Sequence, residues 1–284
     1  MHITRMEQSG AVTSVYFDQR SGVVDLLLTS DVHYDSIHCN RALYKKHLEE
    51  AKRRDAFIID AGDFFDAMQG RYDNRRSYSD IRPEYLGERY YDLIVDDAAK
   101  FLNPYADRFL IFGQGNHENA VRKHASTDLN SRMVGKLRDN GSRCVSGGYG
   151  GWVILYFGED GKKARSAFHI KYFHGSGGDA PASKGTIQTS REAVYLPDAD
   201  LVHNGHSHNE YTLPLKRERI GSKGNLRFDI VHFVRTPGYK DEYGDGSGGF
   251  EVERGGHPKP QGCVWATIEV HKDIVSCKCT GDVA

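Results

Sequence analysis

The chain has 284 residues, of which 38% are hydrophobic and 27% are charged, and its formal net charge at pH 7 is -1. This length and composition suffice to bury a large core, which excludes disorder as a global description. The nearly neutral charge excludes the strongly basic surface of domains that bind nucleic acid through their whole electrostatic field. We expect one domain over residues 1–284, because α/β folds of this size often share one core.

The cysteines and the apolar runs indicate the cellular setting. There are five cysteines, an odd number, and none lies in a Cys-x-x-Cys motif. This argues against a disulfide framework or a zinc ribbon and favours a reducing compartment. We interpret Cys277 and Cys279 as structural residues of an alternating strand. No apolar run approaches the roughly 18 residues of a membrane-spanning helix, and no signal peptide is recognised. We therefore expect a cytoplasmic protein without a membrane segment.

The first half of the chain alternates apolar strands with helices. Residues 12–17 and 23–30 are predicted strands, and the turn formers between them predict a hairpin. Apolar residues at helical spacing predict an amphipathic helix over 40–54. The other elements predicted in this half are strands at 56–61 and 108–112 and helices at 83–101 and 129–140.

The second half becomes rich in strands. Two loops without periodicity, 70–82 and 240–256, are expected to decide specificity. The elements predicted after residue 150 are strands at 151–157, 167–173 and 198–202, a helix at 187–196, and further strands at 210–215, 226–234, 262–271 and 274–280.

Polar residues follow five of these apolar segments. The motifs are Asp31-Val32-His33, Gly62-Asp63-Phe64-Phe65-Asp66, Gly115-Asn116-His117-Glu118, the lone His174, and Gly205-His206-Ser207-His208. In α/β sheets, ligands collect where strands end at their carboxyl edge. We expect seven side chains to converge there as metal ligands: Asp31, His33, Asp63, Asn116, His174, His206 and His208.

Seven ligands exceed one tetrahedral site and suit two divalent ions about 3.5–4 Å apart, bridged by a carboxylate. Asp63 is the expected bridge. Oxygen and nitrogen ligands without thiolate favour manganese, iron or zinc, and we expect two divalent ions with Mn²⁺ preferred over Zn²⁺ or iron.

These five motifs, in this order between Val23 and Asn209, resemble the calcineurin-like metallophosphoesterases. The resemblance implies a four-layer α-β-β-α sandwich in which two mixed β-sheets are flanked by helices. It also implies a division of the ligands between the two ions: Asp31, His33, Asp63 and His208 would hold one metal, and Asp63, Asn116, His174 and His206 the other.

The resemblance further implies the catalytic roles. His117 would protonate the leaving oxygen and Asp66 would hold it, while a metal-bridging hydroxide would attack without a covalent intermediate. Glu118 is expected to orient its neighbours, and His203 either to do the same or to be a core histidine. The alternative for His117 is a weak eighth ligand or a spacer.

One departure from the family is informative. Ser/Thr protein phosphatases of this superfamily continue Gly-Asp-x-x-Asp with Arg-Gly, whereas this chain has Ala67-Met68. The motif instead resembles the branch that holds DNA repair nucleases and small phosphodiesterases, in versions found in phage and bacteria. Candidates to replace the missing phosphate-binding arginine are Arg41, Arg71, Arg75, Arg76 and above all Arg235, although a solvated surface arginine is the commoner role. Tyr239 and Tyr243 are candidates to stack on a base.

The sequence therefore predicts a cytoplasmic microbial or phage enzyme that hydrolyses a phosphate ester, preferentially a phosphodiester of a nucleotide or nucleic acid. The alternatives are a phosphomonoesterase acting on small molecules or proteins, and a metal-binding interaction module without catalytic activity. The oligomeric state is left open.

Overall fold

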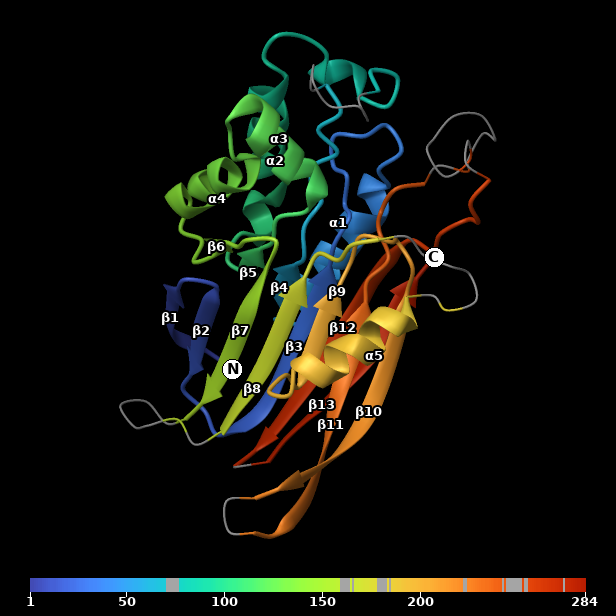
Figure 1. Cartoon of the computed structure of the whole chain (residues 1–284). Coiled ribbons are helices and arrows are strands. Elements are labelled where there is room, and N and C mark those ends of the chain that lie inside the picture. The colour runs from blue at the N-terminus through green and yellow to red at the C-terminus, as the bar shows by residue number, and fades with distance from the viewer. Residues whose placement is uncertain are drawn as a thin grey trace.

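The chain forms two mixed β-sheets in a computed structural model (Figure 1). The structure describes residues 1–69, 77–158, 164, 166–177, 183, 185–221, 224–241, 243, 252, 255–272 and 274–284. Within these residues, the seven-stranded sheet has the order β1 (Ile3–Ser9), β2 (Val12–Phe17), β7 (Gly150–Phe157), β8 (Ser166–Phe173), β9 (Leu201–Asn204), β11 (Leu226–Arg235) and β10 (Tyr211–Ile220). The six-stranded sheet has the order β13 (Ile274–Val283), β12 (Gly262–His271), β3 (Ser21–Thr29), β4 (Phe57–Asp60), β5 (Phe109–Phe112) and β6 (Val145–Ser146).

The two sheets pack face to face over a shared core. Strand β7 alternates between buried and half-buried residues, and its buried Val153 and Leu155 join a cluster with Leu26, Leu28 and Ile59 of the other sheet. Strand β4 is buried at every position, as expected for a central strand covered on both faces.

Helices cover the outer faces of both sheets. In Figure 1, α2, α3 and α4 gather at the upper left, whereas α5 lies in front of the seven-stranded sheet. Apolar residues of α1 to α4 share a core with the outer face of the six-stranded sheet, and those around α5 pack on β9, β10 and β11. The helices are α1 (Arg41–Arg53), α2 (Tyr90–Leu102), α3 (Asn116–Ala125), α4 (Leu129–Asp139) and α5 (Thr186–Tyr195), with short 3-10 helices at Pro83–Tyr85 and Asn103–Tyr105. The predicted four-layer sandwich is confirmed.

Helix α1 shows how local sequence determines one of these layers. The Asn40 side chain accepts a hydrogen bond from the backbone N–H of Leu43 and so caps the helix. Tyr44, His47 and Leu48 are buried on one face, at the spacing that predicts an amphipathic helix over 40–54. The predicted helix is therefore present.

The predicted hairpin between residues 12–17 and 23–30 is wrong. Strand β2 pairs with β1 and β7, whereas β3 pairs with β12 and β4 in the other sheet. The hairpin partner of β2 is β1, which is mostly exposed and therefore lacks the apolar alternation that identifies a strand.

One predicted helix differs from the structure, and one helix was missed. The predicted helix over 83–101 divides into a 3-10 turn and α2, and Gly87 between them has a φ of 134°. Helix α3 was not predicted, because it begins inside the Gly-Asn-His-Glu motif. Much of the two loops expected to control specificity, including residues 70–76 and 244–251, lies outside the described residues.

No helix in the part of the chain that the structure describes combines the length and hydrophobicity that crossing a membrane requires.

Candidate metal centre

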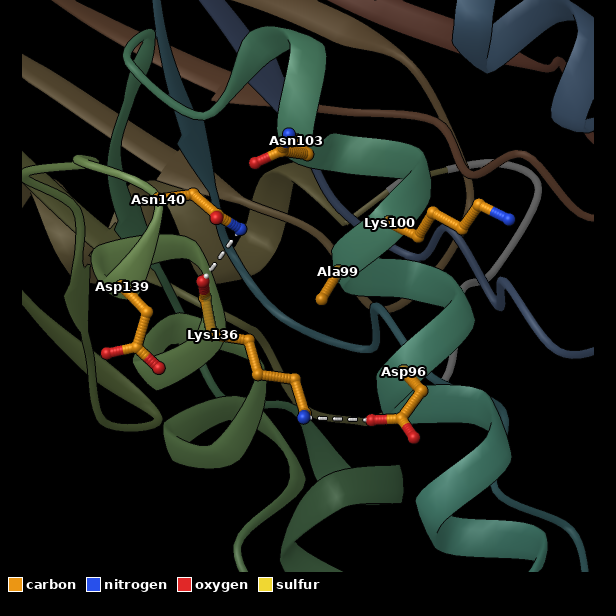
Figure 2. Close-up of a pocket in the computed structure, with 7 residues that line it drawn as sticks. All are labelled: Asp96, Ala99, Lys100, Asn103, Lys136, Asp139 and Asn140. Atoms are coloured by element: carbon orange, nitrogen blue, oxygen red, sulfur yellow. Dashed lines mark hydrogen bonds and ion pairs between the residues drawn. The ribbon is translucent and has the colours of Figure 1, made fainter.

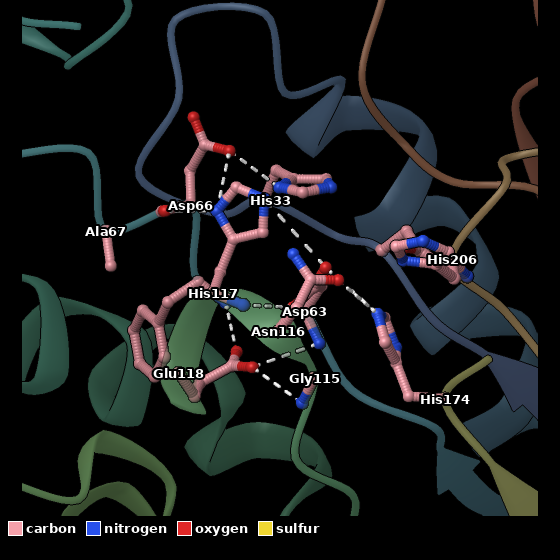
Figure 3. Close-up of polar contacts among 12 residues, drawn as sticks. His33, Asp63, Asp66, Ala67, Gly115, Asn116, His117, Glu118, His174 and His206 are labelled. Carbon is pink, nitrogen blue, oxygen red and sulfur yellow. Dashed lines mark hydrogen bonds and ion pairs between the residues drawn. The ribbon is translucent and has the colours of Figure 1, made fainter. Parts of the chain in front are cut away.

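The ends of five segments meet at one edge of the sandwich. Strands β3, β4 and β5 run parallel in one sheet and β8 and β9 run parallel in the other, so within each sheet their carboxyl ends lie together. The residues that follow these ends contact one another across the two sheets (Figure 3). The convergence expected from the motifs is therefore present as geometry.

Left-handed backbone conformations are concentrated at this edge. Five expected ligands have a positive φ: Asp31 at 53°, His33 at 51°, Asp63 at 53°, His206 at 74° and His208 at 54°. Such a conformation costs a non-glycine residue about 1–3 kcal/mol, although Asp and His tolerate it better than most. Strain of this kind persists where the surrounding structure enforces it, and it marks functional sites.

The expected ligands fall into two groups. In one, the ligand atoms of Asp31, His33 and His208 lie within 4.8 Å of one another. His208 Nε2 lies 3.3 Å from Asp31 Oδ1 and 3.2 Å from His33 Nε2. In the other, Asp63, His174 and His206 lie within the same distance.

Asn116 joins the second group, because its Oδ1 lies 3.1 Å from His174 Nε2. The same nitrogen lies 3.0 Å from Asp63 Oδ2 (Figure 3). All seven expected ligands are therefore at the site.

One hydrogen bond and one close ion pair orient two of the imidazoles. His174 Nδ1 lies 3.1 Å from the Ala61 carbonyl oxygen, and His33 Nδ1 lies 2.7 Å from Asp66 Oδ1. The Nδ1 atom of each ring therefore faces outward, and each ring turns Nε2 toward the centre. Lone pairs and carboxylate oxygens that face one another in a buried space require a cation between them. The residues present fit divalent metal ions.

Without a bound metal ion, the charges around His174 favour a proton on its imidazole. Burial opposes the charged imidazole, but the nearby Asp63 carboxylate outweighs it and raises the pKa of His174 to about 10. Conversely, Asp63 is buried, yet His174 and His117 hold its pKa well below the usual range. Metal binding would displace this proton.

Outer contacts fix the Asp31 carboxylate. Its Oδ2 accepts hydrogen bonds from Ser30 Oγ and, at 2.8 Å, from the backbone N–H of His206. Ser30 Oγ lies 2.7 Å from Thr236 Oγ1, which lies 3.1 Å from His203 Nε2. His203 is thus linked through two hydroxyls to an expected ligand, one of the two roles anticipated for it.

Glu118 fixes the turn that carries Asp63. Its buried carboxylate accepts hydrogen bonds from the backbone N–H groups of Asp63 (3.2 Å), Phe65 (2.8 Å) and Gly115 (2.9 Å) (Figure 3). Burial and the nearby Asp63 raise the pKa of Glu118 to about 8. A Cβ at Gly115 would lie 2.1 Å from Asp63 Oδ1, so this close approach requires glycine.

His117 and Asp66 are neighbours. His117 Nδ1 lies 2.6 Å from the backbone carbonyl oxygen of Asp66 and 3.7 Å from its Oδ1. The carboxylate contacts His33 more closely, at 2.7 Å, and lies 3.5 Å from Lys240 Nζ. The main chain of Asp66 therefore contacts His117 most closely, while its carboxylate lies within ion-pair distance of both His33 and His117.

The expected substrate-binding residues have other roles in this structure. Tyr239 is fully buried and its hydroxyl lies 2.9 Å from His47 Nδ1, so the prediction that it stacks on a base is wrong. Arg41 donates hydrogen bonds to the Tyr34 carbonyl and the Tyr85 hydroxyl, and its guanidinium lies over the Tyr34 ring. These contacts hold Arg41 against the residue that follows His33.

Arg235 is only 3% exposed, which contradicts its prediction as a phosphate clamp. It donates to Ser207 Oγ at 2.8 Å and to Gln188 Oε1 at 3.2 Å, and so positions the turn between His206 and His208. Arg71, Arg75 and Arg76 lie outside the described residues. The Tyr243 hydroxyl donates to the Gly256 carbonyl.

Two functional neighbours were missed. Lys240 is 8% exposed at its side chain and approaches Asp66 from the far end of the chain, which no local motif signals. Asp35 accepts hydrogen bonds from the backbone N–H groups of Asp66 (2.7 Å) and Ala67 (2.9 Å). Its place two residues after His33 was the signal that could have identified it.

A separate hollow of about 480 Å³ lies between α2 and α4. Figure 2 shows that Lys136 reaches from α4 toward Asp96 on α2, where its Nζ pairs with Asp96 Oδ1 at 3.0 Å, while Lys100 and Asp139 point away from this ion pair. None of its lining residues belongs to the seven expected ligands, and we assign it no catalytic role.

Residues 24–210 match the family model of the calcineurin-like phosphoesterases. With the fold and the convergent motifs, this match establishes that the chain belongs to that family, whose members are metal-dependent phosphoesterases acting on phosphate esters. No curated protein matches the chain.

Solved structures resemble the chain only distantly. Vacuolar protein sorting 29 from Cryptosporidium parvum is 11% identical, with a TM-score of 0.39 over 92% of this chain and 99% of that one. A predicted phosphoesterase from Streptococcus pneumoniae is 11% identical, with a TM-score of 0.32 over 92% and 90%. The Zn²⁺ complex of Vps29 from Entamoeba histolytica is 11% identical, with a TM-score of 0.36 over 90% and 98%. We base no argument on similarities of this size.

Proposed function

We propose that this protein is an active phosphodiesterase that holds two divalent ions, preferentially Mn²⁺, and acts on a nucleotide or nucleic acid. One observation carries the preference for a diester. The turn after Asp66 presents buried Ala67 and Met68 where a phosphatase of this superfamily carries arginine.

The charge of the substrate explains why the absence of this arginine favours a diester. A phosphomonoester is a dianion near neutral pH, whereas a diester keeps one negative charge and needs less cationic compensation. Among the described residues, Arg41 and Arg235 donate elsewhere, and Lys240 lies beside Asp66. In the part of the chain that the structure describes, the cationic contribution of side chains around the expected metal ligands is therefore small, which suits the monoanion.

In the proposed reaction, some residues of the centre would bind the metal ions and others would hold the ligands in position. Asp31, His33, Asp63 and His208 would hold one ion, and Asp63, Asn116, His174 and His206 the other. Bound divalent ions would stabilise charge on the phosphoryl oxygens and activate water. Ser30, Glu118 and the backbone around them keep the carboxylates in place.

His117 supplies the proton in this proposal. Its Nδ1 donates to the Asp66 carbonyl, which leaves Nε2 facing the centre, 3.9 Å from Asp63 Oδ2. A proton on Nε2 can pass to the leaving oxygen as the ester bond breaks. The imidazole is 13% exposed at its side chain, so solvent can return the proton.

A comparison of two substrates tests the proposal. The full chain, loaded with Mn²⁺, should hydrolyse bis(para-nitrophenyl) phosphate with a kcat/KM at least about tenfold above that for para-nitrophenyl phosphate, a difference of about 1.4 kcal/mol in transition-state stabilisation. Activity on single-stranded DNA, duplex DNA and cyclic nucleotides then separates the diester classes.

The other outcomes are equally informative. A higher rate on the monoester would establish the phosphomonoesterase alternative. Metal binding without hydrolysis of either ester would establish an interaction module and overturn the enzymatic proposal.

A further inference from the structure

A second group of potential metal ligands lies apart from the centre described above. It consists of His47 on α1, Cys263 on β12 and Asp282 on β13, whose ligand atoms lie within 4.8 Å of one another. Cys263 and Asp282 are direct partners in the antiparallel pairing of β12 with β13, so their side chains share one face of the sheet. Helix α1 packs on that face and delivers His47.

The hydrogen bonds leave His47 Nε2 directed at the space between the three side chains, while Asp282 Oδ2 also accepts from Trp265 Nε1 at 3.3 Å. His47 Nδ1 lies 2.9 Å from the Tyr239 hydroxyl, and that hydroxyl hydrogen-bonds the Cys263 thiol. When the hydroxyl donates to Sγ, it accepts from Nδ1–H, and this tautomer places the lone pair of His47 on Nε2. Nε2 lies 3.8 Å from Asp282 Oδ2.

The environment of His47 is a second observation, besides the grouping of the three side chains, that indicates a bound metal ion. Its side chain is 2% exposed, and among the described residues its Nε2 has no hydrogen-bond partner. A buried imidazole nitrogen without a hydrogen bond is unfavourable unless another partner, such as a metal ion, binds it. Burial also lowers the pKa of His47, which keeps the imidazole neutral and opposes a simple ion pair with Asp282.

The geometry fits a small borderline cation. Bonds of about 2.0–2.2 Å to nitrogen and oxygen in a tetrahedron place these two ligand atoms roughly 3.3–3.5 Å apart. Nε2 and Oδ2 lie 3.8 Å apart, so binding the ion requires the half-exposed Asp282 side chain to close by a few tenths of an ångström. A set of one nitrogen, one sulfur and one oxygen suits zinc. Asp282 is 46% exposed at its side chain, so a water molecule from solvent can complete the tetrahedron.

We propose that His47, Cys263 and Asp282 form a zinc site independent of the dinuclear centre. It joins α1 to β12 and β13, and it fixes Tyr239. The backbone N–H of Tyr239 donates to the Asp31 carbonyl at 2.9 Å, and its carbonyl accepts from Asn40 at 2.7 Å. The ion thus supports the turn that carries an expected ligand of the catalytic centre.

Cobalt substitution tests the site without measuring activity. The full chain, stripped with a chelator and loaded with Co²⁺, should develop a near-ultraviolet thiolate-to-cobalt charge-transfer band. The dinuclear centre offers no thiolate and cannot produce it. Cys263→Ser should abolish the band and reduce bound metal by one ion per chain, whether or not the dinuclear centre is loaded.

Cys277→Ser is the matched control. The Sγ atoms of Cys277 and Cys279 lie 3.8 Å apart, so this pair of thiols could bind cobalt without the proposed site. It should leave the band intact. Asp282→Asn, at a half-exposed position, should weaken zinc binding at least tenfold while the circular dichroism spectrum is unchanged. The proposal is overturned if the native chain shows no band, if the band survives Cys263→Ser, or if Asp282→Asn binds zinc as tightly as the native chain.

Discussion

At the scale of single residues, the proton of His117 is the feature most open to experiment. Its Nδ1 is held by the Asp66 carbonyl, and its Nε2 faces the centre. His117→Ala should keep both metals and lower kcat about 10²-fold or more, in line with general acid catalysis. The loss should be larger for a poor alkoxide leaving group than for para-nitrophenolate, which needs little protonation.

Metal content distinguishes the two hypotheses for this residue. His117 also lies within 4.8 Å of ligand atoms of His33 and Asp63. If His117→Ala loses a metal ion while its fold is unchanged, His117 is a ligand and the assignment as proton donor is wrong.

The buried His203 should make the free energy of unfolding depend on pH. Its complete burial lowers its pKa to about 3 from the 6.5 of an exposed imidazole. The unfolded chain therefore binds a proton between these pH values that the folded chain does not bind. The free energy of unfolding should fall as the pH drops below 6.5 toward 3, by about 1.4 kcal/mol for each pH unit.

Denaturation of the metal-free chain at several pH values measures this slope. His203→Gln, which can keep a hydrogen bond to Thr236 but does not titrate, should flatten it. An unchanged slope in this variant would assign the acid sensitivity to other groups.

At the scale of elements, the first turn of α3 secures the turn after β4. Glu118 accepts three backbone hydrogen bonds, two of them from the Asp63 turn. Glu118→Gln keeps the shape but sets an amide donor against at least one N–H, so the free energy of unfolding should fall by about 1–3 kcal/mol and metal affinity should fall with it.

Chemical denaturation and metal titration check this prediction. The exposed Glu88→Gln is the control, and it should change stability by no more than about 0.5 kcal/mol. Equal effects of the two substitutions would show that the Glu118 contacts do not support the turn.

At the scale of the whole molecule, the metals would join the two sheets. Asp31 and Asp63 follow strands of the six-stranded sheet, whereas His174 and His206 follow strands of the seven-stranded sheet. Each ion bound only by the folded chain stabilises it by about 2.7 kcal/mol at a free concentration one hundred times its Kd. Removing the metals with a chelator should therefore lower Tm by several degrees.

Scanning calorimetry with and without Mn²⁺ measures this shift. His206→Ala should reduce the metal-dependent part of it, whereas the exposed His124→Ala should not. A Tm independent of metal would contradict the proposed ligand set.

The sequence by itself determined the layers and identified the seven side chains that converge at one edge of the sandwich. Apolar strands that end in Asp, Asn or His are local patterns, and the family match over residues 24–210 agrees with the interpretation that they belong together. Single-domain organisation over 1–284 remains a prediction.

Only the tertiary structure decided which strands pair and which groups surround the ligands. The partner of β2 is the exposed β1, Lys240 approaches Asp66 from 174 residues away in the sequence, and Tyr239 is buried. Strand pairing and long-range charge depend on the three-dimensional packing of distant segments, and local periodicity does not say which segments meet. The same packing brings His47, Cys263 and Asp282 together, although no sequence motif connects them.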